Sequence, residues 1–177
     1  MKKIILTACL VLLTAAVAAD EPLQYFSTDV GRSRDQQIRQ FGEFDLYRIG
    51  VQRDFAKPLL QGEKVSLSGY FEASLNHWRG DRDDMIAVAF SPVFVVFFGG
   101  GKYRPYVEGS IGAALLSETE MEGRILSSHY QFENRLGIGL RSRNFDIHLR
   151  YMHYSNGGLD TPNNGVDSAV FGVAFNF

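Results

Sequence analysis

Hydrophobic and polar residues alternate with a period of two along most of the chain beyond residue 19. This alternation is typical of β-strands whose two faces meet different surroundings. Phe71 and Leu75, for example, share one face of a predicted strand, and Glu72 lies on the other. The clearest segments are residues 65–76, 88–98, 107–115, 133–140, 146–151 and 171–177. Two weaker segments near Tyr25–Ser33 and Glu43–Phe55 bring the expected number of strands to eight.

The alternation changes phase within the segment Glu43–Phe55. Phe44 and Leu46 share one parity, whereas Ile49 and Val51 have the other. One extra residue in a strand produces such a shift, so we expect a β-bulge between the two pairs.

Two all-β folds accept eight alternating strands: a soluble β-sandwich and a transmembrane β-barrel. Glu72 and Arg150 lie at mid-strand on the polar face, where a dry sandwich core would reject them and a polar lumen accepts them. The expected strands of about 10 to 14 residues are long enough to cross a bilayer at a tilt. The chain also ends at Phe177 in an alternating aromatic strand, which is similar to the C-terminal assembly signal of bacterial outer-membrane proteins. We therefore predict an eight-stranded antiparallel transmembrane β-barrel.

The connections of such a barrel alternate between short turns and longer external loops. External loops are expected near Arg34–Phe41, Arg79–Asp83, Glu118–Ser128 and Asn156–Val166. Side chains fill the interior of an eight-stranded barrel, so it cannot form a wide pore. The function must therefore lie on the loops, at the rim or on the outer wall.

The first residues of the chain have the pattern of a secretory signal peptide. Lys2 and Lys3 precede a short apolar stretch, and the stretch ends in small residues before a cleavage point after Ala18 or Ala19. We expect a signal peptide at residues 1–18 and the barrel domain at 19–177, exported to the bacterial outer membrane.

Composition narrows the classes of partner further. Without Lys2 and Lys3, the 18 basic and 20 acidic residues become 16 and 20, a formal charge of −4. This charge argues against a polybasic nucleic-acid binder. Cys9, the single cysteine, lies in the expected signal peptide, so the mature chain uses neither a disulfide nor a thiolate. His129 and His148 lack partners at metal-ligand spacing, and we expect no metal and no cofactor.

Polar residues interrupt the outer wall of the last two expected strands. His153 and Ser155 continue the parity of the apolar residue Tyr151, and Asp167 continues the outward parity of the final strand. With the hairpin centred near residue 160, Asp167 lies directly across from His153, about 4.5–5.5 Å away at Cβ. Ser155 follows His153 on the same face, so an imidazole between them could contact both.

These three residue types suit the hydrolysis of an ester. Histidine can take the proton of a serine hydroxyl near neutral pH, and a carboxylate on its other nitrogen fixes the tautomer. Asn156, Gly157 and Gly158 follow the serine and are candidate donors to the oxyanion or support for the site. The structural alternative is a set of ordinary polar residues where a strand leaves the membrane.

Two other groups of polar residues have structural interpretations. Residues 77–84 mix acids and bases and are better explained as a solvated hairpin tip than as a site for a lipid phosphate or a cation. An interior salt-bridge network is expected from Glu72, Glu108, Glu133, Arg135 and Arg150, and His148 is expected to face the lumen.

The stretch His153-Tyr154-Ser155-Asn156-Gly157-Gly158-Leu159 resembles the C-terminal signature of the outer-membrane lipid A 3-O-deacylases, the PagL family. The resemblance implies an eight-stranded barrel with a serine esterase site that removes a 3-O-linked hydroxyacyl chain from lipid A without a cofactor. It implies Ser155 as nucleophile and His153 as base. Asp167 stands where the family carries Glu, and Asn134 where it carries Asp.

Lipopolysaccharide is the partner that this resemblance implies, in the outer membrane, and a homodimer is left open. Two alternatives remain at this point: a non-enzymatic small barrel that acts through its loops, and a phospholipase that uses the same triad. Unchanged lipid A would favour the former, and cleavage of phospholipid micelles the latter.

Overall fold

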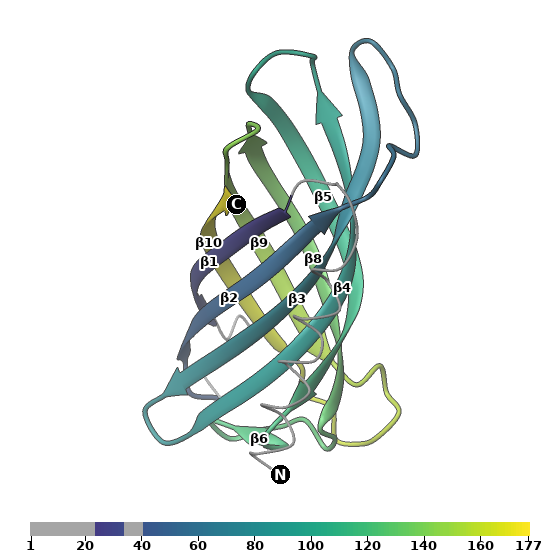
Figure 1. The fold of residues 1–177 in the computed structure, drawn as a ribbon. Helices are drawn as coiled ribbons and strands as arrows, with labels where there is room; N and C mark the ends of the chain where they lie inside the picture. Colours follow the sequence, from purple (N-terminus) through teal and green to yellow (C-terminus); the bar gives the residue numbers. More distant parts are fainter. Residues whose placement is uncertain (1–23, 34–40) are drawn as a thin grey trace.

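A computed structural model describes residues 24–33 and 41–177, and the predicted signal peptide lies outside this part of the chain. Eight strands close into a barrel in the order β1-β10-β9-β8-β5-β4-β3-β2, and β6 and β7 form a separate two-stranded hairpin (Figure 1). The strands are β1 (Gln24–Ser33), β2 (Phe44–Asp54), β3 (Val65–Gly80), β4 (Asp84–Phe98), β5 (Arg104–Leu116), β6 (Glu120–Met121), β7 (Arg124–Ile125), β8 (Tyr130–Arg141), β9 (Phe145–Ser155) and β10 (Val166–Asn176). Within the described residues, no helix is long and apolar enough to span a membrane.

Every pair of neighbouring barrel strands is antiparallel, as predicted. The first and last strands close the barrel with pairs such as Phe26↔Phe175, which leaves no open sheet edge. The two weaker segments of the sequence are confirmed as β1 and β2. The connections at residues 81–83, 117–129 and 156–165 lie at the same end of the barrel, the lower end in Figure 1.

The predicted bulge in β2 is wrong. The strand pairs without interruption with β1 from Asp45 to Arg53 and with β3 from Phe44 to Asp54. Phe44 and Leu46 point into the barrel and are 2% and 0% exposed, whereas Ile49 points outward. The change of phase arises because the lumen itself becomes apolar at this end, so hydrophobic residues occupy the inner face there.

The outer wall is apolar, as the alternation predicts for a surface in contact with lipid. Phe94, Ile111 and Leu136, from three strands, are among its exposed side chains. Neighbouring aromatic rings also pack on this wall, as in the stacked pair Phe71–Phe90 at 5.9 Å between centroids.

A network of ion pairs fills the middle of the lumen, as predicted. Arg48 Nη1 lies 2.8 Å from Glu133 Oε2 and also pairs with Glu72, and Arg150 Nε lies 2.6 Å from Glu108 Oε1. All these side chains are fully buried. Because an unpaired buried charge is very costly, the mutual pairing allows charged side chains to fill the interior.

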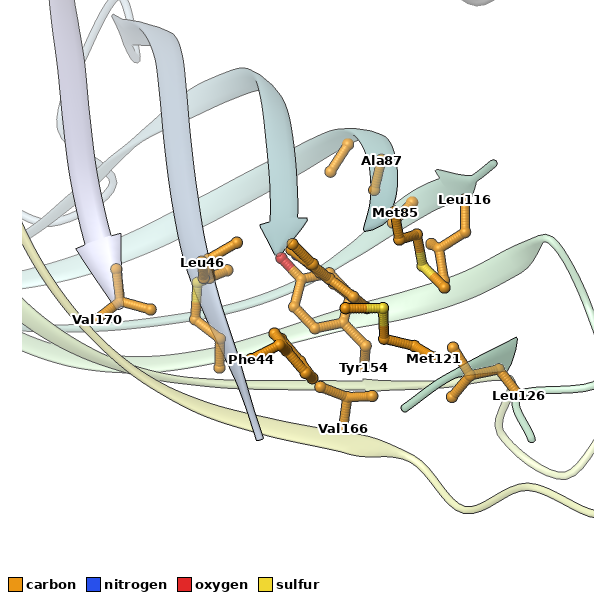
Figure 2. Close-up of a cluster of buried hydrophobic side chains, with 14 residues drawn as sticks. Phe44, Leu46, Met85, Ala87, Leu116, Met121, Leu126, Tyr154, Val166 and Val170 are labelled. Atoms are coloured by element: carbon orange, nitrogen blue, oxygen red, sulfur yellow. The ribbon is translucent and has the colours of Figure 1, made fainter. Parts of the chain in front are cut away.

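An apolar cluster covers this network toward each end of the barrel. The sequence analysis had predicted a polar lumen and did not predict these clusters. Tyr70, Val93, Val95, Phe97 and Tyr106 form the smaller cluster. The larger one lies toward the external loops. Figure 2 shows how Met121, the last residue of β6, and Leu126, directly after β7, join strand residues within it. The hairpin thus closes the barrel mouth with hydrophobic side chains.

Candidate active site

The candidate site lies on the outside of the barrel where β9 and β10 leave the apolar wall. The register pairs Asp167 with His153, as the sequence predicts. His153 Nδ1 lies 2.8 Å from Asp167 Oδ1, and the two side chains are 37% and 38% exposed. They are therefore open to the surroundings of the barrel while remaining hydrogen-bonded to each other.

The hydrogen bond at Nδ1 determines what the other imidazole nitrogen can do. With Nδ1–H donating to Asp167, Nε2 carries the lone pair and can accept a proton. Gly165, at φ +61°, covers this edge of the ring: a Cβ built there would lie 3.1 Å from His153 Cε1 and 3.7 Å from Nε2. The left-handed backbone and the close approach both favour glycine at this position.

Ser155 lies on the same outward face of β9, two residues beyond His153, and Met152 and Tyr154 between and beside them point inward. The spacing of alternate residues along a strand is about 6.5–7 Å. The Ser155 hydroxyl makes no hydrogen bond to His153 or to another described residue. Catalytic hydrogen bonds are often long in ligand-free enzymes and tighten when substrate binds.

Tyr151 provides a second hydrogen bond to the acidic residue, which sequence reasoning missed. Its hydroxyl donates to Asp167 Oδ1 at 2.5 Å, the oxygen that also contacts His153. Tyr151 is paired with Ala169, two residues from Asp167 on the same face of β10. The sequence predicted Tyr151 only as a lipid-facing residue, because alternation identifies a face and not a diagonal contact across it.

Tyr154 ties the site to the charged lumen. It lies between His153 and Ser155 in sequence, and its hydroxyl donates to Glu133 Oε2 at 2.8 Å. Its ring packs edge-on against Trp78 with 4.8 Å between centroids. Both contacts are buried, so they hold the strand segment that presents His153 and Ser155 on the other face.

The loop after Ser155 is organised around the buried side chain of Asn156. Asn156 Nδ2 donates to the carbonyls of Leu126 and Asp160, both at 3.0 Å, and its Oδ1 accepts from Gly158 N at 2.8 Å. Through these bonds Asn156 supports the loop, and the N–H of Gly158 is already hydrogen-bonded. The exposed Gly157 makes no hydrogen bond through its N–H to another described residue.

The β6–β7 hairpin supports the same loop from the barrel mouth. Ile125 N donates to Asn164 Oδ1 at 2.8 Å, and Asn164 N donates to Ile125 O at 3.1 Å. Ser127 Oγ donates to the carbonyl of Pro162 at 2.5 Å. Together with the Asn156–Leu126 bond, these contacts fix the chain on both sides of the loop and deliver Gly165 to His153.

Glu122, between β6 and β7, connects the other external loops. Its carboxylate accepts from Arg82 N at 2.7 Å and Asp83 N at 3.0 Å, and its carbonyl accepts from Gly42 N at 3.0 Å. Burial by itself would raise the pKa of this carboxyl, but the two N–H groups and the Arg82 guanidinium hold it below its usual value. Arg82 and Asp83 thus help to join the loops, whereas the sequence had suggested only a solvated hairpin tip.

Comparison with known proteins identifies the family. The family model described as Lipid A 3-O-deacylase (PagL) matches residues 45–176. The lipid A deacylase PagL of Pseudomonas aeruginosa is 33% identical over 171 residues, which cover 95% of each chain. The chain belongs to the lipid A 3-O-deacylase family. A PagL of Bordetella bronchiseptica is 36% identical over 75 residues, 42% of each chain.

The fold agrees with this assignment. A crystal structure described as that of the outer membrane enzyme PagL matches with a TM-score of 0.78 and 32% identity, covering 86% of this chain and 99% of the other. The chain is thus an outer-membrane β-barrel of the PagL family, as predicted. The predicted signal peptide, the triad and the possible homodimer remain predictions.

Two further positions complete the description of this PagL-family site. Asn134 pairs with His153 across β8 and β9, so it lies beside the imidazole on the side opposite Asp167. His148 points into the lumen, where it contacts Asp146 at 2.7 Å and pairs with Asp29. The described residues contain no cluster of three or more His, Cys, Asp or Glu that could hold a metal ion.

Proposed function

We propose that this chain is a serine esterase that removes the 3-O-linked hydroxyacyl chain from lipid A in the outer membrane. Ser155 is the nucleophile, His153 the general base and Asp167 the acid that orients it. The observation that carries the proposal is the outward-facing His153–Asp167 pair at 2.8 Å, with Ser155 two residues beyond His153 on the same face of β9. Membership of the PagL family supports the choice of lipid A as the substrate.

The proposed reaction follows from the state of the imidazole. Nε2 takes the proton of the Ser155 hydroxyl as the oxygen attacks the ester carbonyl carbon. The bond from this carbon to the sugar oxygen then breaks, and the protonated His153 returns the proton to the leaving sugar hydroxyl. Water, deprotonated by the same nitrogen, attacks the carbonyl carbon of the acyl-serine. The bond from this carbon to the Ser155 oxygen then breaks, His153 returns the proton to that oxygen, and the hydroxy fatty acid is released. Asp167 stabilises the imidazolium in both halves.

The negative oxygen of each tetrahedral intermediate needs a hydrogen-bond donor that is not already engaged. Of the three residues expected to serve the oxyanion or support the site, Asn156 and Gly158 bond to each other within the loop. Gly157 retains an N–H without a partner among the described residues and lies two positions after Ser155. We therefore assign the oxyanion donor to Gly157 and the supporting role to Asn156 and Gly158.

The test is to incubate the purified, refolded barrel with lipopolysaccharide and to analyse the lipid A by mass spectrometry. We expect the loss of one hydroxyacyl group with the native chain and none with Ser155→Ala. Ser68→Ala, at the opposite end of the barrel, is the matched control and should retain activity. Hydrolysis that persists in Ser155→Ala would refute the assignment, and cleavage of phospholipid alone would change the substrate.

A further inference from the structure

We propose that a hollow beside Asp167 binds the sugar headgroup of the substrate. This inference rests on the proposed function and adds a subsite to it. The hollow has a volume of about 570 Å³ and begins at Asp167 and Tyr151. Of the described residues, Arg32, Ser33, Glu43, Ser168 and Ala169 also line it.

The hollow exists because a small residue separates two large ones. The register pairs Arg32 of β1 with Ala169 of β10, and Ala169 with Tyr151 of β9, so the three outward side chains form one row. With about 5 Å between neighbouring strands, Arg32 and Tyr151 are some 10 Å apart at the backbone. The methyl group of Ala169 forms the floor between them, which leaves room for a sugar ring.

The position of the hollow on the barrel matches the boundary between acyl chains and headgroups. The next outward row on the same strands consists of the exposed Val30, Phe171 and Leu149, which are all apolar. Arg32 is thus the first charged residue on the outer face of β1 beyond the lipid-facing wall, toward the external loops. A molecule bound here would place its apolar part against this wall and its polar part among Arg32 and Glu43.

The chemistry of the lining favours hydroxyl groups over a phosphate. Arg32 Nη2 lies 3.0 Å from Glu43 Oε2, with side chains 69% and 49% exposed. The pair therefore offers donors and an acceptor side by side, which suits sugar hydroxyls because they both donate and accept. Asp167 adds a second carboxylate, so the described residues of the lining carry no excess positive charge to attract a phosphate dianion.

The hollow is also adjacent to the reacting atoms. Asp167 lines it and contacts His153 directly, and Ser155 lies about 6.5–7 Å further along β9. A sugar headgroup seated between Arg32 and Tyr151 would need to extend only past the imidazole to bring its ester to Ser155. The hollow would then supply the alcohol side of the ester, and the acyl side would lie elsewhere on the wall.

The experiment compares two esters of the same hydroxy fatty acid in detergent micelles, one with glucosamine and one with p-nitrophenol. The measured quantity is the ratio of kcat/KM for the sugar ester to that for the nitrophenyl ester. Ala169→Phe fills the hollow and should lower this ratio at least about tenfold. Ala73→Phe, an outward substitution on the opposite wall, is the control and should leave it within about twofold.

Glu43→Gln keeps the shape of the hollow and removes one acceptor charge, so it should lower the ratio by about three- to tenfold. A 1-phosphorylated sugar ester should react within about threefold of the unphosphorylated one, because the lining residues that the structure describes carry no excess positive charge. A ratio that is unchanged in both Ala169→Phe and Glu43→Gln would overturn the subsite, as would a hundredfold preference for the phosphorylated ester.

These outcomes are separate from the failure of the proposed function. If the native chain hydrolyses both esters through Ser155 and the ratio does not respond to the hollow, only the subsite is refuted. If the native chain hydrolyses neither ester, the esterase assignment fails and the subsite fails with it. Should Ala169→Phe not form a barrel, as judged by heat-dependent mobility on SDS gels, Glu43→Gln decides alone.

Discussion

Replacing Asp167 by Asn tests whether the carboxylate beside His153 acts in catalysis. The substitution preserves the shape of the side chain and removes the charge that lies 2.8 Å from Nδ1. Two unit charges about 4 Å apart near a protein surface attract each other by about 4 kcal/mol at an effective dielectric constant of 20. Since each 1.36 kcal/mol corresponds to a factor of ten in rate, we expect kcat to fall about 10³-fold.

Two structural features determine how large the decrease in kcat should be. Both side chains are more than one third exposed, so solvent screens the pair and keeps the effect at or below the 10⁴-fold known for buried triads. The amide of Asn can also donate to Nδ1, which would place the proton on Nε2 and block proton abstraction from Ser155. The loss should therefore be in kcat, with little change in KM.

The assay is the initial rate of hydroxyacyl release from lipopolysaccharide by Asp167→Asn. Asp84→Asn is the matched control, because Asp84 forms another exposed pair with a histidine, at 3.8 Å from His77 on distant strands. The control should retain full activity. Asp167→Glu, which adds one methylene group, should remain within about tenfold of the native rate. A loss of less than tenfold in Asp167→Asn would refute the catalytic role of the carboxylate.

Three further substitutions test how the scaffold holds the site. Gly165→Ala should reduce kcat about 10²-fold because its Cβ would lie 3.1 Å from His153 Cε1. Gly99→Ala is the control: it also has positive φ, it has no atom within 4 Å, and it lies in the turn between β4 and β5 at the other end of the barrel, so it should affect only stability. Equal activity losses in the two variants would contradict this reasoning. Glu122→Gln should lower the Tm at pH 7, because the lowered pKa of Glu122 in the folded state means that its charged form stabilises the fold. The difference in Tm from the native chain should shrink as the pH falls below the unfolded-state pKa of about 4.3. A difference in Tm that does not depend on pH would exclude this carboxylate as the cause. Arg48→Met should destabilise the barrel by about 3–5 kcal/mol in urea titrations, because it leaves two buried carboxylates without this partner; a neutral result would show that the network relaxes.

Alternation alone predicted most of the barrel, and its errors have a common physical origin. Alternation identifies which residues share a face of a strand, but it does not show whether the surroundings of that face are polar or apolar at each level along the barrel axis. In β2, Phe44 and Leu46 belong to the inner face because the lumen ends in an apolar cluster. Along β2 the hydrophobic residues therefore change from the inward to the outward parity. A β-bulge would produce the same change in the sequence pattern.

The site was predictable to the extent that strand geometry alone determined it. Parity and the centre of the last hairpin were enough to pair His153 with Asp167. The contact of Gly165 with the imidazole and the support from Ile125 depend on how the external loops fold against one another. No short-range pattern records such contacts, because the partners come from different loops and meet through backbone atoms.

The proposed catalytic site lies on the outer wall of the barrel, so its rigidity must come from the lumen side of the strands and from the external loops. On the lumen side, the hydroxyl of Tyr154 is bonded to Glu133, which is itself paired with Arg48 in a fully buried network. At the external end of the barrel, the β6–β7 hairpin holds the loop that places Gly165 close to His153. We therefore expect the charged lumen, which side chains fill, to support the proposed reaction by limiting the movement of the strand that carries His153 and Ser155.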